Sequence, residues 1–397
     1  MGALRGIVRG ASGLLADARR ARRESGVSLA EQFRQIQMLR AHALHFGLSD
    51  YYFYRLYRPQ FSDAQRAEFI GWRGDHKMDA MLNHPGLEHV THDKVLYADL
   101  MAGIGAPTPE ILALIGGMRR NTGGTRYLAD VEALAAFIDE YFREADKPGI
   151  FIKPVAGSFG KGALAITGCA DGGTMLALAN GKRLETRRLQ PLLEFAAYRG
   201  LMAQKFLRPH SSIGEITAAK LASVRFTILR LGDRFIPLRA TLRIPVGNTM
   251  VDNYSGGRTG NLIAAIDVDT GGIWRVVSGQ KFDVRECSTH PDTGRPLTGF
   301  VLPDWERAVS AMMAAASHLP DMRFQHWDIA FTDQGPLLLE VNTGGGLNLH
   351  QLAHDRGLYT EELCTAIAEY AASSETIERL MVAERPTITD ADMQAAP

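Results

Sequence analysis

The sequence predicts an α/β (α+β) protein in which a mainly helical N-terminal region precedes two subdomains of strands and helices. Its 397 residues are more than one core usually holds, so two or three subdomains are expected. Residues 1–85 read as largely helical, with Ser28 and Glu31 spaced as a capping box. From His92 onward, short apolar runs, glycine-rich turns and helical segments alternate, which is typical of α/β architecture.

The predicted boundaries divide the chain into four parts. These are a helical region at 1–90, a first subdomain at 91–205, a second subdomain at 206–360, and a C-terminal helix with a frayed tail at 361–397. Within the helical region, the arginines at 19–23 predict a solvated helix face, with a membrane-surface or acidic-partner site as the alternative. The aromatic run at 51–57 predicts a core cluster rather than a ligand-stacking surface.

Composition narrows the function classes. The formal net charge is zero, so no bulk electrostatic field indicates nucleic-acid binding. No run approaches the roughly 18 apolar residues of a membrane span, and no secretory signal is recognisable. Cys169, Cys287 and Cys364 are widely spaced and fit neither a disulfide framework nor a metal site. We therefore expect a cytoplasmic protein without nucleic-acid or integral-membrane partners, and a homodimer stays open.

The first subdomain begins with a predicted helix at 94–102 that ends in a turn rich in glycine and proline. Apolar strands at 150–153 and 163–167 enclose a glycine-rich loop at 157–162, and a further strand follows at 201–207. This loop joins two strands, so it fits neither the Walker A pattern nor the dinucleotide fingerprint, which both lead from a strand into a helix.

A glycine-rich loop between strands can still cover a triphosphate with its backbone N–H groups, as protein kinases do. We expect Gly157, Ser158, Gly160 and Lys161 to contact phosphate in this way. Lys153, on the strand just before the loop, would act as a point charge for phosphate. The alternative is a plain hairpin turn with incidental lysines.

The second subdomain is predicted to be richer in strands. The expected elements are strands at 224–231, 234–244, 261–268, 324–331 and 336–341, a glycine- and asparagine-rich loop at 252–260, and a helix at 305–317.

The last two of these strands carry a candidate metal site. Asp333-Gln-Gly-Pro336 predicts a hairpin turn between them. Alternate strand residues face the same side, so Glu340 and Asn342 project together and Asp328 meets them from the neighbouring strand. Two carboxylates and an amide oxygen suit Mg²⁺, which needs few protein ligands when phosphates supply the rest. The alternative is a polar edge strand.

Two lysines, a glycine loop and a distant Asp…Glu-x-Asn set together resemble the ATP-grasp superfamily over about 91–351. Lys94 and Lys153 are similar to its nucleotide lysines, and the stretch at 150–168 resembles its flexible lid. Gln204, Lys205, Phe206 and Leu207 resemble the hinge strand whose backbone reads adenine. Segments at 251–257, 290–294, 299–305 and 342–346 resemble the sugar-transfer-associated ATP-grasp group, which is related to alpha-L-glutamate ligases.

The resemblance implies a nucleotide held between two α+β subdomains, with ATP and Mg²⁺ as cofactors and Mn²⁺ as a substitute. It places the metal on Asp328, Glu340 and Asn342. It further implies a ligase that phosphorylates a small-molecule carboxylate and lets an amine displace phosphate from the acyl phosphate. The chain departs from the family pattern twice: Gln204 stands where many members carry an acid, and His326 where peptide-forming members carry an arginine.

Arg243, and after it Arg225, are the candidates to supply the missing positive charge at the acyl phosphate. A structural salt bridge across the sheet is the alternative for Arg225. The expected substrate side consists of Asn253, Gly256, Gly257, His326, Gly344 and Gly345, with simple turns as the alternative for the glycines.

Other functions stay open at this stage. A kinase would phosphorylate a hydroxyl and stop there, and a nucleotide sensor would not catalyse a reaction. His350 and His354 lie four residues apart on a predicted helix but lack a third metal ligand. Neither the acid nor the amine is identified, and we expect the N-terminal helices and the loop at 252–260 to select them.

Overall fold

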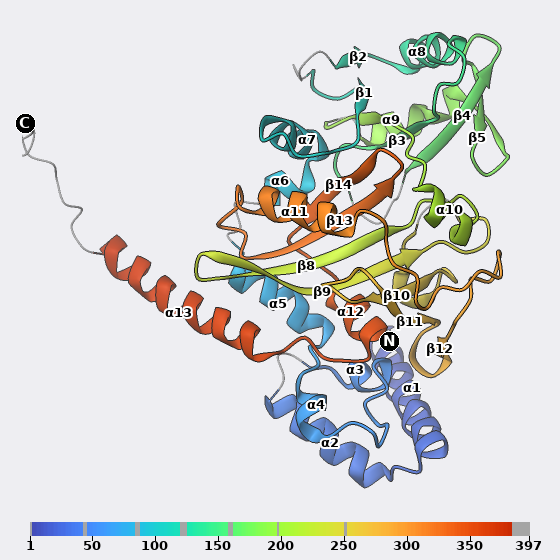
Figure 1. Cartoon of the computed structure of the whole chain (residues 1–397). Coiled ribbons are helices and arrows are strands. Elements are labelled where there is room, and N and C mark those ends of the chain that lie inside the picture. Colours follow the sequence, from blue (N-terminus) through green and yellow to red (C-terminus); the bar gives the residue numbers. More distant parts are fainter. Residues whose placement is uncertain are drawn as a thin grey trace, which may run out of the picture.

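A computed structural model describes residues 2–42, 46–83, 88–119, 125–157, 162–196, 198–249 and 252–382. It contains two seven-stranded sheets and a helical N-terminal region, which confirms the predicted fold class (Figure 1). In Figure 1 the first sheet lies at the top, the second in the middle, and the N-terminal helices α1 to α4 at the bottom. The predicted tail beyond Val382 lies outside the described residues.

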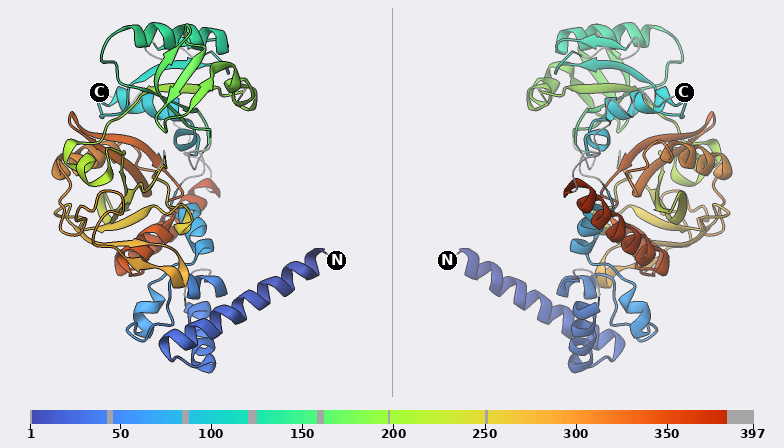
Figure 2. Two further views of the ribbon diagram at one scale, coloured as in Figure 1. Left: turned by 90° about the vertical axis from the view of Figure 1, so that its right-hand side faces the viewer. Right: turned by 90° about the vertical axis from the view of Figure 1, so that its left-hand side faces the viewer.

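The N-terminal region is helical, as expected. Its helices are α1 (Gly2–Ser25), α2 (Leu29–His42), α3 (Leu48–Phe53), α4 (Asp63–Ala67), α5 (Trp72–Leu82) and α6 (Glu88–His92). The aromatic run is a core: Tyr51, Tyr52 and Tyr57 are at most 4% exposed and pack with Leu39. Figure 2 shows α1 projecting away from the rest of the molecule at its N-terminal end.

The first sheet has the strand order β2-β1-β7-β3-β4-β5-β6. The strands are β1 (Ile111–Ile115), β2 (Arg126–Leu128), β3 (Ile150–Pro154), β4 (Leu164–Ala170), β5 (Met175–Leu178), β6 (Arg183–Glu185) and β7 (Leu201–Lys205). Helix α7 (Lys94–Gly103) precedes it. Helices α8 (Val131–Arg143) and α9 (Gln190–Phe195) pack on it, because Leu134, Ile138 and Leu193 bury their side chains against its apolar residues.

The second sheet has the order β12-β11-β10-β9-β8-β13-β14. The strands are β8 (Ser223–Leu231), β9 (Arg234–Ile244), β10 (Leu262–Ile266), β11 (Ile273–Ser278), β12 (Arg285–Glu286), β13 (Phe324–Thr332) and β14 (Gly335–Asn342). The chain enters this sheet from β7 through α10 (Ser211–Thr217).

Alternation along its strands gives the second sheet two different faces. Val224, Phe226 and Trp327 point to one side, where α7, α10 and α11 (Trp305–Ala316) bury them. Thr227 and His326 point to the other side, where α5, α12 (Leu347–His354) and α13 (Glu361–Val382) pack. Arg225, Arg243 and Asp328 are thereby collected on this second face, whereas Gln325 points to the opposite side and bonds Ala316 O at the end of α11.

A β-bulge at Leu339 sets the orientation of the last strand. Asp328 pairs with Glu340 but Ile329 pairs with Leu338, so Leu339 is an extra residue on β14. Because of it, Leu338 and Val341 both reach the apolar core although they are three residues apart. The bulge therefore turns Glu340 to the polar face.

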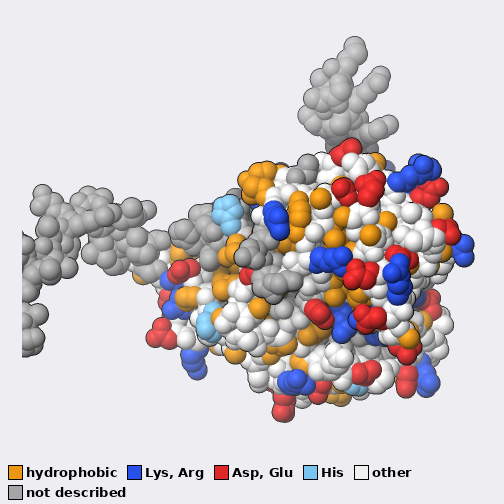
Figure 3. Space-filling view, turned by 90° about the horizontal axis from the view of Figure 1, so that it is seen from above, with side chains coloured by type: hydrophobic (Ala, Val, Ile, Leu, Met, Phe, Trp, Pro, Cys, Tyr) orange, Lys and Arg blue, Asp and Glu red, His pale blue; other side chains and the backbone are white. Residues whose placement is uncertain are grey.

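Figure 3, which views the molecule from the side of the first sheet, shows basic and acidic side chains intermixed on that face. No helix in the described part of the chain is both long and apolar enough to cross a membrane.

Candidate active site

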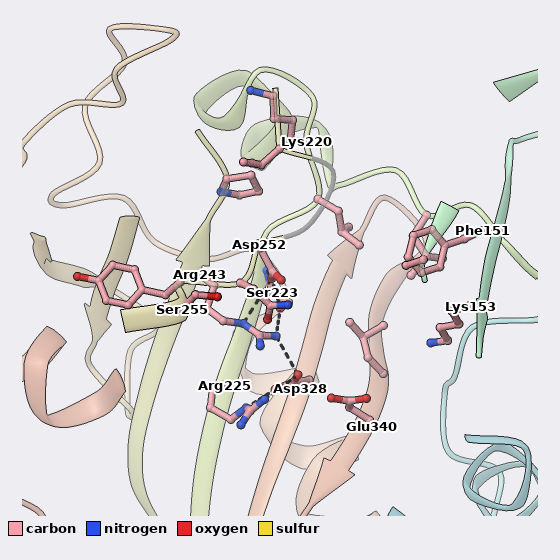
Figure 4. Close-up of a pocket in the computed structure, with 18 of the residues that line it drawn as sticks. Phe151, Lys153, Lys220, Ser223, Arg225, Arg243, Asp252, Ser255, Asp328 and Glu340 are labelled. Atoms are coloured by element: carbon pink, nitrogen blue, oxygen red, sulfur yellow. Dashed lines mark hydrogen bonds and ion pairs between the residues drawn. The ribbon is translucent and has the colours of Figure 1, made fainter. Parts of the chain in front are cut away.

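A cavity of about 990 Å³ lies between the two sheets. Its walls come from β3 and β7 of the first sheet, from β8, β9, β13 and β14 of the second, and from α5 and α12. The polar face of the second sheet forms its floor (Figure 4). The positions of the residues predicted to bind phosphate, metal and substrate can therefore be described relative to this one cavity.

Lys94 lies at one end of this cavity, where a helix start meets a strand end. Asp93 caps α7, because its carboxylate accepts hydrogen bonds from the backbone N–H groups of Val95 and Leu96. The Lys94 backbone N–H donates to Val155 O at 3.1 Å, and its Nζ donates to Gly157 O at 2.6 Å. The lysine thus sits beside the entry to the glycine loop.

Lys153 is the second cation of this end. Its side chain extends from β3 toward the floor of the cavity, where Glu340 lies (Figure 4). Loss of hydration lowers the pKa of Lys153 to about 8, against the opposing influence of Glu340 and with a smaller contribution from nearby Lys94. Two ammonium groups at one end of a cavity suit a phosphate chain.

The predicted hinge forms the adjoining wall. Gln204, Lys205, Phe206 and Leu207 all line the cavity, at the end of β7 and just beyond it. Gln204 is 7% exposed, and the Phe206 N–H donates to Gly149 O at 2.7 Å. Gly157 also lines the cavity, whereas Ser158, Gly160 and Lys161 lie outside the described residues.

The predicted metal residues lie next to one another. Asp328 and Glu340 are paired across β13 and β14, and Asn342 Nδ2 donates to Glu340 Oε1 at 3.2 Å. The described residues contain no group of three or more His, Cys, Asp or Glu side chains placed to hold a metal. Two carboxylates and one amide fit an ion that takes most of its ligands from phosphates and water, which is the habit of Mg²⁺.

Two arginines bind Asp328. The Arg225 Nε donates to Asp328 Oδ1 and its Nη2 donates to Oδ2 at 3.1 Å, while Arg243 Nη2 donates to the same Oδ2 at 2.8 Å. Burial raises the pKa of Asp328, but the two guanidinium groups outweigh it and hold that pKa well below its usual range. The salt bridge across the sheet, given as the alternative for Arg225, is thus present for both arginines.

Arg243 also joins a polar cluster that the sequence did not reveal. Its Nη2 donates to Ser223 Oγ, and its Nε lies 3.4 Å from Asp252 Oδ2. The Ser223 N–H donates to the same Asp252 oxygen at 3.0 Å. Burial lowers the pKa of Arg243, but Asp252 and Asp328 outweigh it and raise that pKa above its ordinary value. The loop at 252–260 is thereby fastened to the floor of the cavity.

His326 does not line the cavity, which corrects the expectation that it contacts substrate. It is fully buried, with Nδ1 2.8 Å from Thr227 Oγ1 and Nε2 3.1 Å from Asp79 Oδ1. Burial lowers the pKa of His326 to about 3, so the ring is neutral. His350 continues this chain through Thr227 and Thr241 and belongs to no metal site in the described structure.

The predicted substrate glycines divide into two groups. Gly256, Gly344 and Gly345 line the cavity, as Asn253 does. Gly257 does not, because it packs on the Gly279 backbone so closely that a Cβ would lie 2.3 Å from Gly279 O, which corrects the prediction. A Cβ at Gly345 would lie 2.0 Å from His326 Nδ1, so this glycine lets the chain leave β14 over the buried ring.

Several lining residues had no individual signal in the sequence. Phe151 and Lys220 line the upper part of the cavity, and Trp72, Asp75 and His76 reach it from α5. Three residues of α5 thus line the pocket, where the sequence predicted only a general contribution from the N-terminal helices. The spacing of Trp72, Asp75 and His76 at i, i+3 and i+4 was the one pattern that could have suggested a common helix face.

Comparisons with known structures find matches at low similarity. An L-amino acid ligase from Bacillus licheniformis matches with 11% identity and a TM-score of 0.35, over 67% of this chain and 43% of the ligase. D-alanyl-alanine synthetase A from Vibrio cholerae matches with 11% identity and a TM-score of 0.41, over 73% and 68%. Biotin carboxylase from Campylobacter jejuni matches with 9% identity and a TM-score of 0.42, over 72% and 48%. The chain thus spans less than half the length of the first and the third of these proteins.

The family assignment rests on sequence. No curated protein matches the chain. A family model described as sugar-transfer associated ATP-grasp matches residues 75–366, which include both sheets, both lysines and the Asp328 floor. Proteins of the ATP-grasp superfamily generally use ATP and Mg²⁺. The chain belongs to the sugar-transfer associated ATP-grasp family.

Proposed function

We propose that this protein is an ATP-dependent carboxylate–amine ligase that works through an acyl phosphate and releases ADP and phosphate. The observation that carries the proposal is the convergence, in one cavity, of two lysines, an acidic pair with an amide, and two arginines. A protein that only sensed nucleotide would not need the buried arginine–carboxylate network that lies beneath the phosphate end.

Lys94 and Lys153 would bind the phosphate chain, and Gln204 to Leu207 would bind the adenosine end. Asp328, Glu340 and Asn342 would hold Mg²⁺, with Mn²⁺ as a substitute; the ion supplies charge neutralisation at the phosphate oxygens. Glu340 contributes most directly, because both oxygens of Asp328 already accept hydrogen bonds from arginine. The glycine loop would exclude water from a hydrolysable acyl phosphate.

In the first step, a carboxylate oxygen of the acid attacks the γ-phosphorus and the bond to the β–γ bridging oxygen breaks, which releases ADP. Arg243 and Arg225 lie where their guanidinium groups would bind the transferred phosphoryl group. In the second step, the amine nitrogen attacks the acyl carbon, the bond from carbon to the phosphate oxygen breaks, and phosphate leaves. Backbone N–H groups of Gly344 and Gly345 are available at this wall for the developing oxyanion.

The test is ADP and phosphate formation by purified protein with Mg²⁺, screened against pools of carboxylic acids with and without amines. The proposal expects turnover that requires an acid and is lost in Glu340→Gln. A phosphorylated product without free phosphate would identify a kinase instead. Binding of ATP without turnover for any pool would favour a nucleotide sensor.

A further inference from the structure

One end of the cavity has no part in the chemistry derived so far. It is formed by α5 and the start of α12, and its lining residues are Trp72, Asp75, His76 and Asn348. Trp72, Asp75, His76 and Asp79 follow one another at i, i+3, i+4 and i+7, so they share one face of α5. This face turns toward the Gly344–Leu347 segment.

At this end of the cavity, the Asp75 carboxylate has a hydrogen-bond partner on one oxygen and, among the described residues, none on the other. Its Oδ2 accepts a hydrogen bond from the Leu347 N–H at 2.9 Å, which satisfies a free donor at the start of α12. Its Oδ1 is buried and has no hydrogen-bond partner. A carboxylate oxygen held in this way loses water without a replacement, and a ligand that donates a hydrogen bond would restore one.

A second carboxyl group lies close to Asp75, and neither carboxyl has a lysine or arginine partner among the residues that the structure describes. Asp79 lies one turn further along α5, and in the described part of the chain no lysine or arginine forms an ion pair with either carboxylate. Burial and the neighbouring Asp79 raise the pKa of Asp75 to about 6, against the influence of His326 and His76. Burial also raises the pKa of Asp79 well above its usual range, so Asp75 is the group whose charge a positively charged ligand would balance.

This end is joined to the proposed reaction centre by a short backbone segment. Arg225 Nη1 donates to Gly345 O at 2.9 Å, and two residues later the Leu347 N–H donates to Asp75. Asp75 and Arg225 therefore both contact the Gly344–Leu347 segment. A ligand at Asp75 would thus share one cavity with Lys94 and Lys153 and lie next to the segment that Arg225 contacts.

We infer that this end of the cavity binds the amine co-substrate as a primary ammonium group, with Asp75 Oδ1 accepting one of its N–H hydrogens. The inference rests on the proposed ligase function. Asp75 takes one proton from the ammonium group, and the free amine then attacks the acyl carbon as the bond from that carbon to the phosphate oxygen breaks. The second proton that the nitrogen loses goes to the departing phosphate, and Asp75 releases its own proton to solvent, so protons and charge balance.

The body of the amine has a place beside Trp72. The indole is 56% exposed at the cavity wall and offers an aromatic face to a cation or a hydrocarbon chain. A second cavity of about 210 Å³ shares Trp72 and Asn348 with the main one and is lined by Phe53 and Tyr54. We therefore assign an amine whose substituent extends over Trp72 toward this aromatic-lined space.

The experiment separates acid activation from amine capture. Wild-type protein, Asp75→Asn and Asp75→Glu are assayed with ATP, Mg²⁺ and the carboxylic acid pool, first with hydroxylamine and then with a pool of primary amines. Hydroxylamine is uncharged near neutral pH and traps an acyl phosphate as hydroxamate without needing an ammonium site. Asp233→Asn is the matched control, because its side chain is fully exposed on the β8–β9 turn.

Asp75→Asn is expected to form hydroxamate at the wild-type rate and to raise the KM for the primary amine about 10- to 100-fold, as expected for a lost charge-assisted hydrogen bond. Asp75→Glu, which keeps the carboxylate, should recover part of that loss. Trp72→Leu should raise the same KM with Trp274→Leu as its control, so the inference does not depend on one variant folding.

Hydroxamate formation with an unchanged amine KM in Asp75→Asn would overturn the inference and leave the ligase function standing. Hydroxamate formation by wild-type protein that accepts no primary amine would overturn it as well. Absence of hydroxamate with every acid, despite ATP binding, would instead remove the ligase function on which it rests.

Discussion

Two aspartates in the same cavity illustrate opposite uses of a carboxylate. Asp328 has both oxygens bound by Arg225 and Arg243, and its pKa is held below the ordinary range. Asp75 has one oxygen bound by a backbone N–H and the other unbound, and its pKa is raised to about 6. Both oxygens of Asp328 already have partners in the protein, whereas one Asp75 oxygen has no partner among the described residues and would gain one from a ligand. Burial therefore does not by itself tell whether a carboxylate serves the fold or a substrate.

The largest effect is expected when Arg225, one of the two cations bound to Asp328, is replaced. Arg225→Met would leave Arg243 as the remaining arginine bound to the buried Asp328 carboxylate, and Gly345 O would lose its hydrogen bond from Arg225. We expect the free energy of unfolding to fall by roughly 3–5 kcal/mol, as for one-sided removal of a buried ion pair. Urea denaturation measures it, with exposed Arg234→Met as the control. A loss below about 0.5 kcal/mol, the range of neutral surface changes, would show that the ion pair does not hold the floor together.

Glu340→Gln tests the proposed chemistry beside that ion pair while leaving the pair intact. Its amide keeps an acceptor for Asn342 Nδ2, so stability should stay within about 0.5 kcal/mol of wild type. Acid-dependent ADP formation should fall at least about 100-fold, because a carboxylate ligand for the metal is lost. ADP release is the measurement, and Glu361→Gln at the start of α13 is the control. Wild-type turnover in this variant would exclude Glu340 as a metal ligand.

Asp75→Asn sharpens the comparison by acting on stability in the opposite direction. The folded-state pKa of Asp75, about 6, lies above its unfolded value, so ionising it costs stability as pH rises from about 4 to 6. The asparagine can still accept from the Leu347 N–H. We expect the variant to be more stable than wild type by on the order of 1 kcal/mol at pH 7, and the difference to vanish below about pH 4. Denaturation at both pH values measures this; a variant less stable than wild type at pH 7 would contradict it.

Lys153→Met should change the free energy of unfolding least, and this change should depend on pH above about 8. The pKa of Lys153 is lowered to about 8, so the charged form costs stability at neutral pH and that cost fades as pH rises through 8 toward the unfolded value. Because the side chain is partly exposed, we expect a gain of about 1 kcal/mol or less at pH 7, shrinking by pH 10. Thermal unfolding at several pH values measures it, with exposed Lys182→Met as the control. A gain that grows with pH would contradict the assigned cause.

The sequence was sufficient for the parts of the site that lie on regular, local patterns. The hairpin turn at Asp333 and the alternation of β13 place Asp328, Glu340 and Asn342 correctly, and Asp93 identifies the start of α7. These predictions succeed because neighbours in sequence determine a turn, a cap and a strand face.

The parts that could not be predicted depend on distant contacts. The bond between Leu347 and Asp75 joins residues 272 positions apart, and the cluster of Arg243 with Asp252 requires a loop to fold back on the sheet. His326 shares a strand face with Asp328, yet α5 covers one of them and the cavity reaches the other. Alternation predicts the side of a sheet but not what lies over it.

The extra residue at Leu339 makes chain length as important as residue type. Pairing resumes at Leu338 on one side of it and at Glu340 on the other. If Leu339 paired in the ladder instead of forming the bulge, strict alternation from Leu338 would turn Glu340 and Asn342 toward the core and Val341 toward the cavity. Substitutions here change one wall contact, whereas loss of the bulge with Leu339 still in the chain would invert the whole end of the strand. The geometry of the proposed metal site thus depends on a count of residues that no comparison of side chains alone would reveal.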